Sequence, residues 1–212
     1  GTLYDDMWGG DGDDTMFGDD GIGQEHLGFD YSPGVGMQSN ANVTWSVWLG
    51  DDDMWGGDGN DHMHGRGGND DMWGGDDNDH MYGDGGVDTM FGGDGIDRMW
   101  GGQDTDWMWG QDGTDSLRGG AGSDWIWGGA DTDHLYGGLE PLAGIAIGVG
   151  IDHLYGEDGD DYLYGQDGDD ALDGGNDNDQ LQGGSGDDWL QGGRGDDWQN
   201  GGDGDDLFKF RT

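Results

Sequence analysis

The sequence predicts an all-β fold, a solenoid with two parallel sheets wound from short repeats. Three observations lead to this prediction. A nine-residue motif recurs along nearly the whole chain, glycine occupies 54 of the 212 positions, and a large apolar side chain returns in almost every repeat. Self-similarity at a short fixed period is typical of solenoid proteins, in which a repeat buries its apolar side chain only by stacking on its neighbours.

The repeat has the form GGxGxDxUx, where U is a large apolar residue, and the first full run of copies begins at Gly56. Position 8 is Met, Leu or Ile in nearly every copy, but Gln199 takes this place near the end. Position 6 is aspartate in every copy, and partial copies add Asp5 and Asp14. We therefore interpret residues 1–212 as a single array.

Each unit divides into a turn and a strand. Glycines at positions 1, 2 and 4 permit the positive φ angles of a tight turn. Positions 7 to 9 are expected to form a three-residue strand whose middle side chain faces inward. Two units make one coil of eighteen residues, so strands in each sheet stack about 4.8 Å apart. Asp61 is then expected above Asp79 at one edge, and Asp70 above Asp88 at the other.

Several copies depart from the consensus. Position 4 is aspartate instead of glycine at Asp77, Asp104, Asp131 and Asp177. Position 2 is replaced by Arg66, Asp84, Gln111, Glu157 and Gln166. Because a short polar side chain can adopt a left-handed backbone, we expect the aspartate sites to keep the turn at the cost of slight strain.

The charge balance predicts cations as partners. The chain has 49 acidic and 6 basic residues, a formal net charge of -43. A field of this sign repels phosphate, so it argues against nucleic acid and anionic membranes as partners. Stacked carboxylates are unstable without cations between them, and a shell of six or more hard oxygens suits Ca²⁺.

We therefore expect roughly a dozen or more calcium ions, because about fourteen would bring the net charge to roughly -15. Folding and metal binding would then be one transition. The candidate metal ligands are Asp14, Asp52, Asp61, Asp70, Asp79, Asp88, Asp97, Asp106, Asp115, Asp124, Asp133, Asp152, Asp161, Asp170, Asp179, Asp188, Asp197 and Asp206.

The repeated GGxGxD turns resemble those of the RTX (repeats-in-toxin) family over nearly the whole chain. This resemblance implies a right-handed parallel β-roll with calcium in the turns. It also implies type I secretion from a Gram-negative bacterium, with folding outside the cell or at its surface. The chain starts part-way through a repeat without an initiator Met, so we expect a fragment or a processed piece. Its lack of cysteine leaves calcium, not disulfides, to make it rigid.

Side chains at positions 7 and 9 are expected to point outward, which places an aromatic stripe on the surface. The candidate partner face comprises Trp55, Trp73, Phe91, Trp100, Trp107, Trp109, Trp125, Trp127 and Tyr155. Three interpretations stay open. Another copy of the chain or a neighbouring domain could cover the stripe, the rings could stack on sugars of a polysaccharide, or they could stabilise their own sheet across strands.

Two insertions interrupt the array. Residues 22–49 contain an alternating apolar run that predicts a strand or hairpin docked on the roll. Residues 139–148 are small and apolar, which suits either an edge cap or a contact with a partner or lipid. The longest apolar run, residues 142–151, is too short to span a bilayer.

No catalytic motif stands out. Carboxylates that recur with the repeat suit structural ligands better than a unique acid and base, and no GxSxG, HExxH or P-loop occurs. We therefore expect no enzyme. His62, His64 and His80 could cluster around Zn²⁺, or they could form a plain surface row.

Two functional classes follow. The favoured one is a calcium-stiffened extracellular module for adhesion, a surface layer or a filament, which associates through the aromatic face. The alternative is the non-catalytic C-terminal part of a secreted hydrolase or toxin, which assists secretion and folding.

Overall fold

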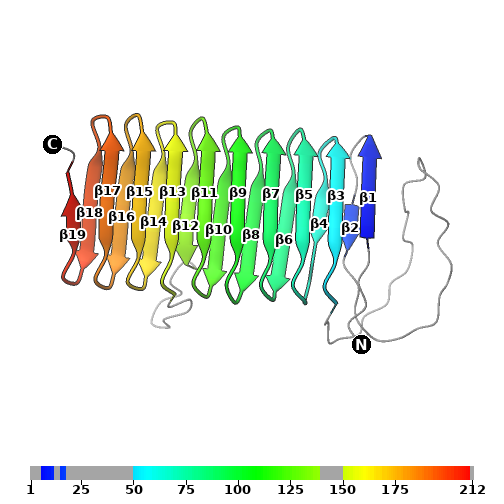
Figure 1. Ribbon diagram of the computed structural model, residues 1–212, viewed down its shortest axis with the longest axis horizontal. Coiled ribbons are helices and arrows are strands. Elements are labelled where there is room, and N and C mark those ends of the chain that lie inside the picture. Colours follow the sequence, from blue (N-terminus) through cyan, green and yellow to red (C-terminus); the bar gives the residue numbers. More distant parts are fainter. Residues whose placement is uncertain (1–5, 12–14, 18–49, 139–149, 211–212) are drawn as a thin grey trace.

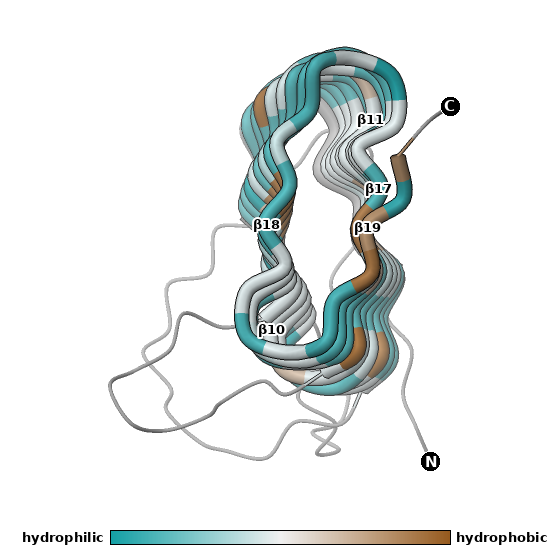
Figure 2. Tube along the Cα trace, turned by 90° about the vertical axis from the view of Figure 1, so that its left-hand side faces the viewer, coloured by the Kyte–Doolittle hydropathy of each residue, from teal (hydrophilic) through white to brown (hydrophobic). Residues whose placement is uncertain are grey.

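The computed structural model describes residues 6–11, 15–17, 50–138 and 150–210. Its strands lie side by side along the long axis of a flattened solenoid (Figure 1). Viewed end on, successive coils superimpose as one elongated ring with a sheet along each long side (Figure 2). All neighbouring strands of both sheets are parallel, so the predicted all-β roll with two parallel sheets is confirmed.

Odd-numbered and even-numbered strands form separate sheets because the chain crosses over at every turn. The ten-stranded sheet contains β1 (Asp6–Asp11), β3 (Asp53–Asp58), β5 (Asp71–Asp76), β7 (Thr89–Asp94), β9 (Trp107–Asp112), β11 (Trp125–Ala130), β13 (His153–Asp158), β15 (Ala171–Asn176), β17 (Trp189–Arg194) and β19 (Leu207–Lys209). The nine-stranded sheet contains β2 (Thr15–Phe17), β4 (His62–His64), β6 (His80–Gly85), β8 (Arg98–Gln103), β10 (Ser116–Ala121), β12 (His134–Gly138), β14 (Tyr162–Asp167), β16 (Gln180–Ser185) and β18 (Trp198–Asp203).

Position 8 builds the core. Each of these side chains pairs in register with its equivalent one coil away, as Met72 does with Met54 and Met90. All are fully buried between the two sheets, and Phe208 packs against them from the last coil. The buried row is Met54, Met63, Met72, Met81, Met90, Met99, Met108, Leu117, Ile126, Leu135, Leu154, Leu163, Leu172, Leu181 and Leu190.

The strands are longer than the sequence predicts. Most contain six residues, from position 7 through position 3 of the next unit, where three were expected. The glycine pair therefore lies inside the strand, and Gly57 pairs in register with Gly75. The prediction of positive φ at position 1 is also wrong, because among the described glycines the positive angles fall at positions 2 and 4.

The departures from the glycine consensus all keep the turn backbone. Each replaced residue at position 2 or 4 has a positive φ between 71° and 82°. Left-handed backbone costs a residue with a side chain roughly 1–2 kcal/mol, so this strain is spread over nine places. They are Arg66, Asp77, Asp84, Asp104, Gln111, Asp131, Glu157, Gln166 and Asp177.

The second insertion does not interrupt the stack. The backbone N–H of Asp124 donates to Oδ1 of Asp152 across it at 2.8 Å, and β11 pairs directly with β13. The strand predicted in 22–49, the cap predicted in 139–148, and both Asp5 and Asp14 lie outside the described residues. Among those that the structure describes, no helix has the length and apolar character to cross a bilayer.

Candidate metal sites and aromatic rows

The aspartates of position 6 are buried charged groups that recur at every turn between the sheets. Each has an exposed fraction of 2% or less. They are Asp52, Asp61, Asp70, Asp79, Asp88, Asp97, Asp106, Asp115, Asp124, Asp133, Asp152, Asp161, Asp170, Asp179 and Asp188. Asp197 and Asp206 belong to the last coil and are half-buried.

From Asp70 to Asp206, one carboxylate oxygen of each aspartate accepts a hydrogen bond from the previous coil. Oδ1 of Asp106 accepts the backbone N–H of Asp88 at 2.9 Å, and the carbonyl of Asp88 accepts the N–H of Trp107 at 2.9 Å. The same arrangement continues to Asp206, whose Oδ1 accepts the N–H of Asp188 at 3.1 Å. The predicted stacking of each aspartate on its equivalent one coil away is therefore confirmed.

The second carboxylate oxygen, Oδ2, is the unusual one. In the described residues it is buried and has no hydrogen-bond partner in fourteen of these aspartates. A buried acceptor without a partner costs about 1–3 kcal/mol, and more when it is charged. The fourteen are Asp61, Asp70, Asp79, Asp88, Asp97, Asp106, Asp115, Asp124, Asp133, Asp152, Asp161, Asp170, Asp179 and Asp188.

A backbone carbonyl faces the same space as Oδ2. A Cβ added to Gly101 would lie 2.8 Å from the carbonyl oxygen of Gly119, and closer still to Oδ2 of Asp106. Position 1 is therefore glycine because two oxygens crowd its Cα, not because its φ is positive. Such a gathering of hard oxygens is the donor chemistry that Ca²⁺ prefers.

Burial disfavours the ionised form of these carboxylates. Burial raises the pKa of Asp106 to about 9, although the hydrogen bond from Asp88 lowers it in part and neighbouring carboxylates raise it further. The same cause raises the pKa of Asp97 to about 6 and that of Asp133 to about 8. At pH 7 carboxyls such as Asp106 and Asp133 therefore take up a proton unless a cation is bound beside them.

The ligand set suits calcium and excludes the zinc hypothesis. Within the described ranges, no group of three or more His, Cys, Asp or Glu side chains converges. A cation beside Oδ2 would thus take carboxylate and backbone carbonyl oxygens. Of the two alternatives for the histidines, the geometry favours a surface row over a zinc cluster, because the ring of His64 stacks on Tyr82 at 4.4 Å while His62 meets His80 edge-on at 4.6 Å.

The aromatic side chains form ladders in which each ring covers its neighbour. At position 9 of the ten-stranded sheet, ring centroids are 4.7–5.9 Å apart and ring planes differ by 3–9°. This ladder contains Trp55, Trp73, Phe91, Trp109, Trp127 and Tyr155. A second ladder at position 7 joins Trp107, Trp125 and His153.

Stacking changes what this face can offer a partner. All rings of both ladders are half-buried, not bare as the sequence suggests. Their faces lie against one another inside each ladder, so mainly ring edges remain for contacts. The interpretation that the rings stabilise their own sheet thus has direct support, at about 0.5–1.5 kcal/mol per pair. Stacking on sugars would need ring faces that the ladders already use.

The predicted partner face is divided between two sides. Trp100 lies on β8 of the nine-stranded sheet, where it stacks on Tyr82 at 4.6 Å. The other predicted members lie on odd-numbered strands of the opposite sheet. Trp100 therefore cannot contact the same flat surface as Trp109, because the core separates the two sheets.

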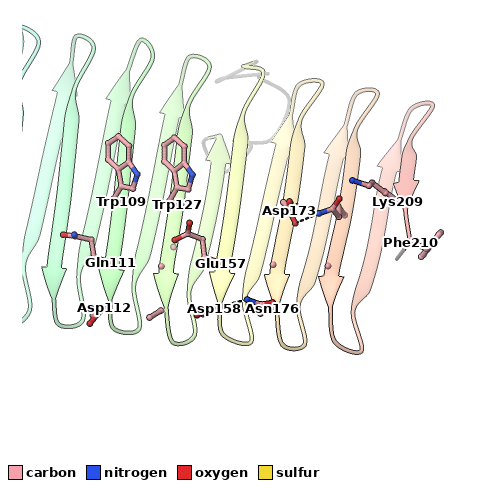
Figure 3. A pocket seen from close by; sticks show the side chains of 16 residues that line it. Trp109, Gln111, Asp112, Trp127, Glu157, Asp158, Asp173, Asn176, Lys209 and Phe210 are labelled. Carbon is pink, nitrogen blue, oxygen red and sulfur yellow. Dashed lines mark hydrogen bonds between the residues drawn. The ribbon is translucent and has the colours of Figure 1, made fainter. Parts of the chain in front are cut away.

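A groove that the sequence analysis missed follows the ten-stranded sheet. It encloses about 1000 Å³ beside Trp109 and Trp127 and extends past Asp173 to Phe210 (Figure 3). Position 2 of these strands is mostly glycine, which leaves the hollow between the outer rows. Glu157 projects into it from such a position, and burial raises the pKa of Glu157, assisted by Asp158.

Comparison with protein families identifies the repeat that builds this geometry. A family model described as RTX calcium-binding nonapeptide repeat matches residues 4–24, 49–81, 82–117, 109–140, 147–181 and 173–208. Comparison with curated proteins gave no significant match. The matched segments cover more than half of the chain and contain the position-6 aspartates described above. The chain therefore belongs to the family of RTX calcium-binding nonapeptide repeat proteins.

Proposed function

We propose that this chain is an extracellular structural module that folds when it binds calcium and associates with other molecules through its outer sheet faces. Calcium binding itself is the property of the family. The observation that carries the proposal is the set of fourteen buried Oδ2 atoms without a hydrogen-bond partner in the described residues. The position-6 aspartates would hold the ions, together with carbonyl oxygens of the glycine turns.

The cost of the buried oxygens supports the coupling of folding to calcium. Each buried acceptor without a partner costs about 1–3 kcal/mol, and more when it is charged. Fourteen such oxygens lie within the described part of one roll. Bound calcium supplies the missing interaction, which makes binding and folding one transition.

A calcium titration followed by far-UV circular dichroism tests this proposal. We expect a chain without regular structure in chelator and a cooperative gain of β signal as calcium is added. Magnesium at equal concentration is the control, and it should produce little change because it demands a small octahedral shell and retains its water. Full β signal in chelator would contradict the proposal.

The midpoint of that titration also tests the extracellular assignment. Calcium modules that work outside cells bind with dissociation constants of about 10⁻⁴–10⁻³ M. A midpoint in this range would leave the chain unfolded in cytosol and folded outside, as expected from the typical secretion of RTX proteins by Gram-negative bacteria. A midpoint below about 10⁻⁶ M would contradict secretion in the unfolded state.

A further inference from the structure

Between β3 and β12 the two outer faces of the roll carry different charge patterns. On the ten-stranded sheet, position 3 presents a row of exposed carboxylates from Asp58, Asp76, Asp94 and Asp112. These residues are in register on neighbouring strands. The strands β3, β5, β7, β9 and β11 contain no Lys, Arg or His. We call this surface the acidic face.

The cationic groups on the nine-stranded sheet between β4 and β12 are Arg98 and Arg118. His62, His80 and Arg98 follow one another in register at position 7, and Arg98 Nη1 donates to His80 Nε2 at 2.9 Å, which leaves His80 neutral. Arg118 lies over the ring of Tyr136, 5.0 Å from its centroid. In β4, β6, β8, β10 and β12 the single acidic residue is Asp84. We call this surface the basic face.

This segregation is notable in so acidic a chain. Only six lysines and arginines are available, and two of them lie on strands of the basic face, whereas the facing strands of the acidic face have none. With a formal net charge of -43, copies of this chain repel one another overall. Contact of an acidic face with a basic face lowers that repulsion locally.

Both faces share one period. Each row repeats once per coil, about every 4.8 Å, so a match between two molecules at one coil is a match at the neighbouring coils. Ring edges of the ladder at Trp73 and Trp109 would meet the edges of Trp100 and Tyr136, which adds apolar contact to the charge pairs. A contact between two different faces leaves one of each free, so it extends into an open stack.

We propose that calcium-loaded copies of this chain associate laterally, with the acidic face of one copy against the basic face of the next. This rests on the proposed structural role of the module. Five strands of six residues provide roughly 500 Å² per partner, which is less than the standard 800 Å². Each contact is therefore weak, and stacks form at high local concentration.

Sedimentation velocity of the calcium-loaded chain, over a range of concentrations at low and high sodium chloride, is the first test. We expect association at low salt and its loss at about 0.5 M, where screening reaches only a few ångströms. The second test reverses the charge of each face by substitutions at exposed positions. His62→Glu with Arg98→Glu reverses the basic face, and Asp76→Lys with Asp94→Lys reverses the acidic face.

Each reversed variant should associate about tenfold or more weakly than the unmodified chain, because like charges then face each other. An equal mixture of the two should regain association, since each reversed face finds its reversed complement. Asp196→Lys with Asp205→Lys is the matched control, because both residues are exposed in the turns and belong to neither face. This control should associate at least as well as the unmodified chain.

A chain that stays monomeric at every concentration in calcium would overturn the proposal. So would association that ignores both salt and face reversal, or a mixture of reversed variants that remains apart. The calcium-induced β signal of each variant is measured in parallel. If the unmodified chain shows that signal but stays monomeric, the lateral contact is refuted and the calcium-folded module stands.

Discussion

Replacing Asp106 by asparagine should have opposite effects on the metal-free and the calcium-loaded roll. Asparagine keeps an Oδ1 that can accept the backbone N–H of Asp88, now 2.9 Å away. It removes the negative charge from the second oxygen, which is buried and lacks a hydrogen-bond partner. The variant therefore separates the role of hydrogen-bond acceptor from that of calcium ligand.

The size of the effect follows from the pKa of this carboxyl. Burial raises it from 3.8 to about 9, so at pH 7 the metal-free fold must take up a proton there. That uptake costs at most about 4 kcal/mol, and Asp106→Asn removes this cost. In calcium the same change removes a charged ligand, and charged ligands set the affinity of calcium sites.

Two measurements separate the effect on the metal-free fold from the effect on calcium binding. In calcium-free buffer, titration with trimethylamine N-oxide drives folding, and the Asp106→Asn variant should fold at a lower concentration. In calcium, isothermal titration calorimetry should show a stoichiometry reduced by one ion. Asp112→Asn is the control, because Asp112 is an exposed acid at the end of β9, the strand that follows Asp106, and its replacement should leave both values nearly unchanged.

Asp106→Asn that destabilises the metal-free fold and retains the full calcium stoichiometry would refute this reasoning. Its carboxylate would then be only a hydrogen-bond acceptor, and the buried oxygen would have some other explanation.

Three further predictions follow from the same geometry. Gly92→Ala places a Cβ against Oδ2 of Asp97 and should lower the free energy of unfolding in calcium by about 1–3 kcal/mol, whereas Gly85→Ala, with its nearest neighbour at 3.5 Å, should change it little in denaturant titrations. Trp109→Ala removes the stacking of this ring on its two neighbours, both at 4.7 Å. It should lower the free energy of unfolding by about 2 kcal/mol or more. In the same denaturant titration, Gln191→Ala on the same row should have a clearly smaller effect. Burial raises the aspartate pKa values from 3.8 to between about 6 and about 9. The metal-free fold should therefore be most stable near pH 4 and lose β signal as pH rises through 6–9. Since protons compete with calcium for the same carboxylates, the calcium midpoint should rise as pH falls through that range. A metal-free β signal that grows with pH would contradict the last prediction.

The repeat period was enough to predict the stack. Because eighteen residues separate equivalent positions, the alignment of Asp61 with Asp79 and the burial of the position-8 row required only arithmetic and the alternation of side chains in a strand. The positive φ at replaced glycines such as Asp104 followed from turn chemistry in the same way.

Features that depend on atomic proximity could not be read from the period. Position 1 is glycine because Oδ2 and a carbonyl oxygen approach its Cα, as at Gly101, and no local pattern distinguishes this cause from a positive φ. The orientation of the rings depends on side-chain packing between coils, so the sequence located Trp109 but could not show that its faces are covered. The period alone does place Trp100 on the opposite sheet from Trp109, since alternate units lie on alternate sheets.

The most direct test of the calcium account is an anomalous difference map from crystals of the calcium-loaded chain, recorded at a wavelength where calcium scatters anomalously. The account predicts two rows of peaks, one at each line of turns, with every internal peak beside a position-6 Oδ2. A map without peaks at these oxygens, or with peaks only along the exposed carboxylates of the acidic face, would contradict it.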